Sequence, residues 1–162
     1  MKKSAGFTLV EMLAAVAVLA VLLGIATPSF IDMVDRNRAA ASANDVMAAV
    51  QIARSEAVRQ RRPVVLCRRG TDAVCEDGTD WSVGWVVGPE DPANAGEIVA
   101  GTEIRIWEQT RGGLNLVGVD QGIVFVADGR TRLAGDQTIT ITPRRAAPRV
   151  VSVSPTGRAS VK

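Results

Sequence analysis

Glu11 is the residue near the start of the chain that most needs a chemical partner. It stands in the otherwise apolar stretch that begins KKSAGFTLVEMLAAV (residues 2–16). An unpaired carboxylate in hydrocarbon costs about 2 to 3 kcal/mol or more. A nearby positive charge offsets this desolvation. The sequence therefore predicts that Glu11 is paired with another group.

The remaining side chains offer little for catalysis. The chain has no histidine, which excludes His-based metal sites and Ser/His/Asp or Cys/His catalysis. It also has no G-x-x-x-x-G-K-[ST] motif and no convincing pair of convergent carboxylates. We therefore expect no catalytic residues, no metal and no cofactor. An exported enzyme on a membrane anchor is the least favoured interpretation.

The apolar N-terminal segment is long enough to cross a bilayer. Residues 7–27 carry one charge, that of Glu11, and about 20 residues of helix span the hydrocarbon core. Lys2 and Lys3 precede the segment and predict an N-terminus in the cytoplasm, with the bulk of the chain outside it. A cleaved signal peptide is disfavoured, because the segment is too long and lacks an A-x-A step. A plain signal anchor explains the apolar segment and the lysines before it, but it does not explain Glu11.

The two cysteines, Cys67 and Cys75, are eight residues apart. This spacing is not C-x-x-C, and two thiols without histidine make a poor zinc site. Outside the cytoplasm a disulfide closing a short loop is favoured, and two unpaired thiols are the alternative.

The elements that must position these residues follow from hydrophobic periodicity. Apolar residues at three- and four-residue spacing, from Ala43 to Ala57, predict an amphipathic helix that continues the anchor to about Arg61, before Pro63. Strands are expected at residues 64–66, 83–87, 104–107, 123–126, 138–142 and 149–153, with a surface loop at residues 88–96. Trp81 and Trp85 are expected to pack in the core. At 47% hydrophobic and 22% charged residues, the chain can bury such a core.

The segment GFTLVE, residues 6–11, resembles the cleavage motif of type IV prepilins and type II secretion pseudopilins. The resemblance implies that a prepilin peptidase cuts between Gly6 and Phe7 and methylates the new amine of Phe7. It also implies that Glu11 meets the N-terminal amine of a neighbouring subunit, or its own, inside a filament. Pro28 stands where many pilins have a helix-bending proline.

This resemblance implies an organisation in three parts. Residues 1–6 would be the leader peptide, residues 7–29 the transmembrane helix and filament-core segment, and residues 30–162 the periplasmic domain. Within that domain, residues 30–61 would be the amphipathic helix and residues 62–162 a β-rich head. The expected fold is α+β and type IV pilin-like, with one long helix packed on antiparallel β-sheet.

Four further segments narrow the resemblance to the GspH/FimT/FimU class of minor pilins and pseudopilins. They are ARSEAV (53–58), RPVVLC (62–67), DGTDWSVGW (77–85) and SPTGR (154–158). The resemblance implies a non-catalytic subunit of the inner membrane that helps to initiate or cap a type IV pilus or a type II secretion pseudopilus. Its partners would be the prepilin peptidase and other pilins or pseudopilins.

The C-terminal tail is basic, because no acidic residue follows Asp136. The basic residues after it are Arg144, Arg145, Arg149, Arg158 and Lys162. Some FimT-like minor pilins have a C-terminal GRxR motif implicated in DNA uptake. Gly157 and Arg158 match its first half, but Ser160 replaces the second arginine. DNA binding is therefore an alternative function, and a solvated basic rim is the simpler interpretation.

Overall fold

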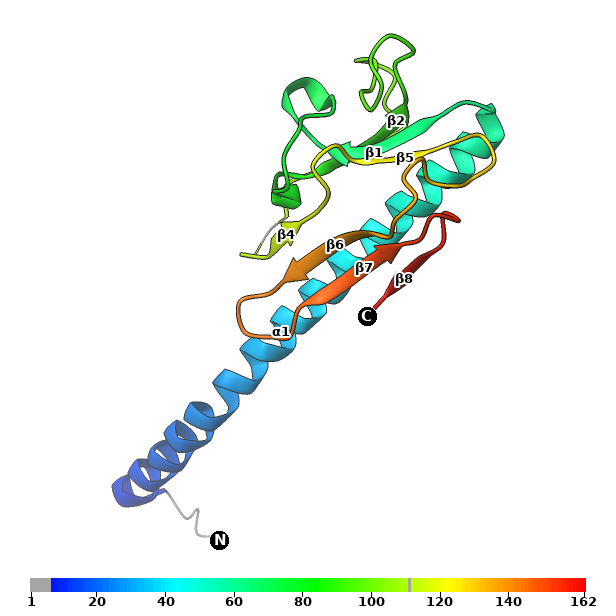
Figure 1. Ribbon diagram of the computed structural model, residues 1–162. Helices are drawn as coiled ribbons and strands as arrows, with labels where there is room; N and C mark the ends of the chain where they lie inside the picture. Colours follow the sequence, from blue (N-terminus) through cyan, green and yellow to red (C-terminus); the bar gives the residue numbers. More distant parts are fainter. Residues whose placement is uncertain (1–6, 111) are drawn as a thin grey trace, which may run out of the picture. The chain divides into compact units, whose positions relative to one another are not determined.

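The computed structural model describes residues 7–110 and 112–162, without the side chains of residues 23–29. The chain divides into two compact units, one ending at Val34 and one spanning Asp35–Lys162, which we call the head. One long helix, α1 (Leu9–Gln60), belongs to both units (Figure 1). The predicted leader, with Lys2, Lys3 and Gly6, lies outside the described residues.

The part of α1 in the head buries a face of small side chains. The fully buried positions recur at three- and four-residue spacing: Ala39, Ala43, Val46, Ala49, Val50, Ala53 and Ala57. Small residues let the sheets approach the helix closely. The helix ends at Gln60 because Arg61 adopts a left-handed conformation (φ 53°) and Pro63 disfavours helix at the residue before it. The predicted amphipathic helix is confirmed, and its end differs by one residue.

Two four-stranded antiparallel sheets complete the head (Figure 1). The first has the order β3-β2-β1-β5, and the second has the order β4-β6-β7-β8. The strands of the first sheet are β1 (Val64–Arg68), β2 (Trp85–Pro89), β3 (Arg105–Trp107) and β5 (Ile123–Phe125). Those of the second are β4 (Asn115–Val117), β6 (Gln137–Thr142), β7 (Arg149–Val153) and β8 (Ala159–Val161). The α+β fold is as predicted.

The sequence-based strand predictions are confirmed in outline and wrong in several details. All six expected runs contain a strand, but Trp81–Val83 forms a 3-10 helix (η2), so β2 begins only at Trp85. This strand also extends through Pro89 into the expected loop. Strands β4 and β8 were not predicted. Each has three residues and forms an edge of the second sheet, β4 on β6 and β8 on β7.

One hydrophobic core joins α1 to the inner faces of both sheets. Trp81 and Trp85 are buried in it, at 0% and 2% exposure, as expected from the sequence. The Trp85 ring stacks on Trp107, with ring centroids 6.0 Å apart. A second, smaller apolar cluster lies on the outer face of the first sheet and contains Val65, Cys67, Val86 and Ile98. The 3-10 helix η1 (Thr71–Ala73) belongs to a loop next to this cluster.

Candidate functional site

Thr8 and Glu11 form a reciprocal set of hydrogen bonds at the start of α1. The Thr8 backbone N–H and its hydroxyl donate to Glu11 Oε2 at 2.9 and 3.0 Å. In return, the Glu11 backbone N–H donates to Thr8 Oγ1 at 3.2 Å. This arrangement is a capping box, with Thr8 as the N-cap and Glu11 three residues later. It satisfies backbone donors that the first helical turn otherwise leaves unpaired.

This role of Thr8 was not predicted from the sequence. The signal was present, because T-x-x-E before an apolar run is the sequence pattern of a capping box. The hydrogen bonds satisfy acceptor positions of the Glu11 carboxylate but do not neutralise its charge. The expected positively charged partner of Glu11 therefore stays a prediction.

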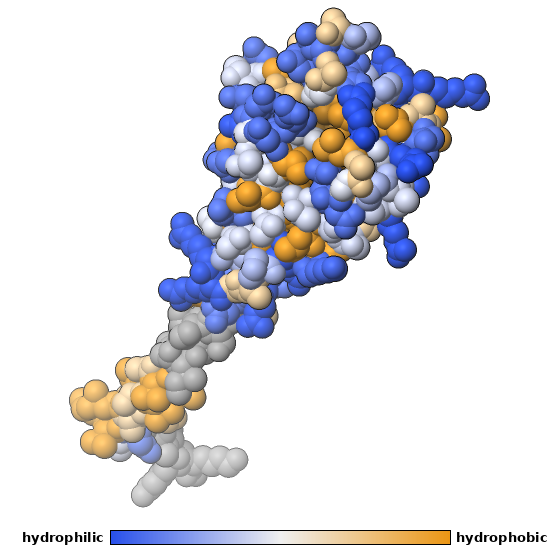
Figure 2. Space-filling view, viewed as in Figure 1, coloured by the Kyte–Doolittle hydropathy of each residue, from blue (hydrophilic) through white to orange (hydrophobic). Residues whose placement is uncertain are grey.

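The surface around Glu11 is apolar. Every described side chain from Phe7 to Leu22 is exposed, and most of them are large hydrophobic groups. Figure 2 shows these apolar side chains gathered on the first unit, whereas the visible face of the head is mixed. Within the described residues, no helix is both long and apolar enough to cross a membrane. The side chain of Pro28 is not described, and the bend expected there stays a prediction.

The predicted disulfide is present in the head. Cys67 and Cys75 are bonded through their sulfur atoms, with their Cα atoms 5.5 Å apart. Cys67 is buried in β1, and Cys75 follows η1 in the loop beyond it. An isolated bridge between Arg69 and Cys75 continues the pairing of the two segments. The disulfide therefore fixes this loop against the outer face of the first sheet.

The ion pair of Glu90 with Arg132 holds together two loops that are distant in sequence. Both guanidinium Nη atoms donate to the carboxylate at 2.5 Å, and the Glu90 side chain is only 7% exposed. The Gly96 backbone N–H also donates to Glu90 Oε1, at 2.7 Å. The hydrogen bonds from Arg132 lower the pKa of Glu90, and partial burial opposes them. The pKa of Arg132 is raised by the same pair.

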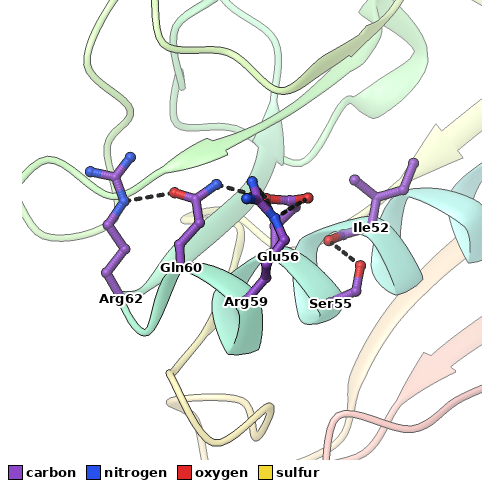
Figure 3. A network of polar contacts seen from close by, with 6 residues as sticks. All are labelled: Ile52, Ser55, Glu56, Arg59, Gln60 and Arg62. Atoms are coloured by element: carbon purple, nitrogen blue, oxygen red, sulfur yellow. Dashed lines mark hydrogen bonds and ion pairs between the residues drawn. The ribbon is translucent and has the colours of Figure 1, made fainter.

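The last turn of α1 carries an exposed polar network (Figure 3). Arg59 donates to the Glu56 carboxylate through Nε and Nη2, and Gln60 Nε2 donates to Glu56 Oε2 at 2.7 Å. The bonds from Arg59 lower the pKa of Glu56. Arg62 Nε donates to Gln60 Oε1 at 2.8 Å. Such exposed pairs contribute little to stability but fix the helix end.

The structure divides the five basic tail residues between the two ends of the second sheet. Arg144 and Arg145 lie in the β6–β7 loop, and Arg149 begins β7. The backbone of Lys162 exchanges two hydrogen bonds with Val150, next to Arg149. These four residues therefore lie at the same end of the sheet (Figure 1).

Arg158 lies at the opposite end of the second sheet. It closes the turn from β7 to β8, where its carbonyl accepts from the Ser154 N–H at 2.9 Å. The five residues of β7, at about 3.3 Å each, separate it from Arg149. The tail therefore does not form one compact basic patch, and DNA binding at it stays an untested prediction.

Comparison with known proteins connects the head to a family. Residues 42–157 match the family described as Type II transport protein GspH. The chain belongs to the GspH family. Residues 1–27 of this GspH-family chain match the prokaryotic N-terminal methylation motif, which contains Phe7, Thr8 and Glu11. No protein of curated function matches the sequence significantly.

Two crystal structures of the type IV minor pilin FimU of Pseudomonas aeruginosa PAO1 have a similar fold. The alignment with the structure in space group P21 covers 80% of the GspH-family chain and 92% of the FimU chain, with a TM-score of 0.62 and 24% sequence identity. The alignment with the structure in space group P65 covers 75% of the GspH-family chain and 90% of the FimU chain, with a TM-score of 0.58 and 24% sequence identity. This likeness concerns the fold. Together with the family and the methylation motif, it identifies a minor pilin or pseudopilin.

Proposed function

We propose that this minor pilin or pseudopilin is cut between Gly6 and Phe7 by a prepilin peptidase and methylated on the amine of Phe7. Residues 7–29 then anchor it in the inner membrane, with the N-terminus in the cytoplasm and the head in the periplasm. From the membrane it passes into a type IV pilus or a type II secretion pseudopilus, where it helps to initiate or cap the filament. It acts by packing and charge pairing and performs no catalysis.

The observation that carries the proposal is Glu11 within an exposed apolar surface. Phe7, Leu9 and Val10 around it are 85%, 75% and 73% exposed. Such a surface is stabilised by lipid or by other subunits, because burial of apolar area drives association. The hydrogen bonds from Thr8 do not neutralise a carboxylate at this position. The positively charged amine of a mature Phe7, from a neighbour or from the same chain, would offset that charge.

The test is the intact mass of the protein purified from membranes, with and without co-expressed prepilin peptidase. We expect the loss of residues 1–6 and the gain of one methyl group on Phe7. A Gly6→Val variant is the control, because a β-branched side chain restricts the backbone at the cleavage site. It should keep its full mass in the presence of the peptidase. A mature chain that still begins at Met1 in its native host would refute the proposal.

A further inference from the structure

Two turns of the head have the same hydrogen bonds and the same two closing residues, glycine and arginine. In the first turn, residues 126–130, the Val126 N–H donates to the Arg130 carbonyl at 2.9 Å. The Gly129 N–H donates back to the Val126 carbonyl at 2.8 Å. Gly129 has φ +81°, a conformation that favours glycine. The turn leaves the Arg130 side chain exposed.

The second turn, residues 154–158, repeats this geometry. The Ser154 N–H donates to the Arg158 carbonyl at 2.9 Å, and the Gly157 N–H donates to the Ser154 carbonyl at 2.8 Å. Gly157 has φ +75°, and Arg158 is exposed. The segment SPTGR, which carried part of the family resemblance, is therefore a turn that presents an arginine.

The two turns pack on each other and on one helical arginine. The Thr131 N–H donates to the Pro155 carbonyl at 3.0 Å, which joins the two segments. A Cβ built on Gly129 would lie 3.2 Å from Arg54 Nε, and one on Gly157 would lie 3.3 Å from it. The half-buried Arg54 side chain from α1 therefore lies against both glycines.

Arg54, Arg130 and Arg158 form what we call the arginine cluster. In the described part of the chain none of the three takes part in an ion pair. The one carboxylate in the two turns, Asp128, accepts a hydrogen bond from the Arg130 backbone N–H at 2.9 Å. Positive charges on neighbouring segments without an ion pair attract a partner with several carboxylates.

The same head carries a surface of opposite charge. A cavity of about 480 Å³ lies on the outer face of the first sheet, beside the Cys67–Cys75 disulfide. Four carboxylates line it: Glu76, Asp77, Glu97 and Asp120. Glu76 is paired with Arg68 at 3.0 Å. Arg132, the one basic residue among the lining residues, is already paired with Glu90. The other three carboxylates have no ion pair within the described residues.

We propose that the arginine cluster of one copy binds the acidic cavity of a second copy. The cavity is large enough to admit an arginine side chain, and guanidinium groups form strong, bidentate hydrogen bonds with carboxylates. The exposed charges of the arginine cluster and of the acidic cavity steer two heads together before any tighter packing forms. The inference rests on the proposed function only in that a filament brings heads side by side.

The test uses the full-length chain in detergent micelles, measured by sedimentation at low and high salt. We expect self-association at low salt that weakens about tenfold or more in 0.5 M NaCl, because salt screens exposed charges. The variant Arg130→Glu/Arg158→Glu should lose this association, and so should Asp77→Arg/Asp120→Arg. Mixing the two variants in equal amounts should restore it, because the reversed cluster of one then faces the reversed cavity of the other.

The matched control is Arg144→Glu/Arg145→Glu, which makes the same charge change at the β6–β7 loop. This control should associate as the original chain does. Any self-association through the apolar anchor is the same in every variant, so it does not affect the comparison. Absence of association at low salt, equal loss in the control, or no recovery on mixing would each overturn the proposal. So would loss of duplex DNA retardation in Arg130→Glu/Arg158→Glu with association unchanged. Leader removal is not needed here, so failure of this test leaves the processing test standing.

Discussion

Glu11 Oε2 accepts two hydrogen bonds from Thr8, one from its backbone N–H and one from its hydroxyl. The carboxylate therefore has a local polar partner before any second subunit arrives. Glu11 therefore has two separable roles. The capping box needs a hydrogen-bond acceptor at position 11, whereas charge pairing needs an anion there. Glutamine can act in a capping box but carries no charge.

We predict that Glu11→Gln and Glu11→Val both insert in the membrane but enter filaments poorly. The glutamine variant keeps the cap and loses the charge, so its failure would be due to the missing charge pair. The measurement is the ratio of filament-bound to membrane-bound protein after shearing. Normal incorporation of Glu11→Gln would exclude the pairing of Glu11 with an amine.

Thr8→Val is the complementary variant, because it removes the hydroxyl of the capping box and retains the charge of Glu11. Loss of an N-cap typically costs about 1 kcal/mol, which corresponds to roughly fivefold faster local opening. Amide hydrogen exchange at residues 9–11 in micelles would show this change. Exchange at the original rate would mean that the Thr8 hydroxyl does not stabilise the first turn.

The Glu90–Arg132 pair predicts a pH-dependent part of the head's stability. The pKa of Glu90 is lowered in the folded state, so its stabilisation is complete above the unfolded pKa and is lost as pH falls through the folded pKa. Glu90→Gln should unfold more easily at pH 7 by about 1 kcal/mol, a value reduced because Arg132 is partly exposed. This difference should shrink towards pH 3 in urea titrations. A difference that stays constant with pH would contradict the assigned ion pair.

The disulfide should stabilise the head without determining its fold. We expect Cys67→Ala/Cys75→Ala to lose about 2 to 3 kcal/mol of unfolding free energy, measured by urea denaturation. The far-UV circular dichroism spectrum should stay the same, because the main core lies on the other face of the first sheet. Reductant should lower the urea midpoint of the original chain and leave the variant unaffected. Complete unfolding of the variant would show that the loop is needed for the fold.

Gly157 should tolerate no side chain, for two separable reasons. Its φ is +75°, and a Cβ there would collide with the Gly129 carbonyl. Gly101 has φ +82° with nothing within 4 Å of a Cβ, and Gly135 has open space without a left-handed backbone. Alanine should cost about 0 to 0.5 kcal/mol at Gly135, about 1 at Gly101 and clearly more at Gly157. Equal costs at Gly101 and Gly157, measured by thermal unfolding, would mean that the turns do not pack as described.

The sequence alone determined the elements that depend on local pattern. Spacing of apolar residues predicted α1 in the head almost to its last residue, and the strand expected at residues 138–142 is β6. The motif GFTLVE pointed to the pilin family, and the apolar N-terminal segment with Lys2 and Lys3 placed the cysteines outside the cytoplasm, where a disulfide is favoured. These signals are readable because each lies within a few neighbouring residues.

Only the tertiary structure decided which distant residues meet. The tail arginines are close in sequence, yet the length of β7 places Arg149 and Arg158 at opposite ends of the sheet. Conversely, Arg54, Arg130 and Arg158 lie far apart in the chain and converge because two glycine turns pack on one helix. Strands β4 and β8 likewise form because β6 and β7 offer them free edges. Local pattern sets where a helix or strand forms, but pairing across the fold is set by packing and backbone hydrogen bonds between segments that the sequence keeps apart.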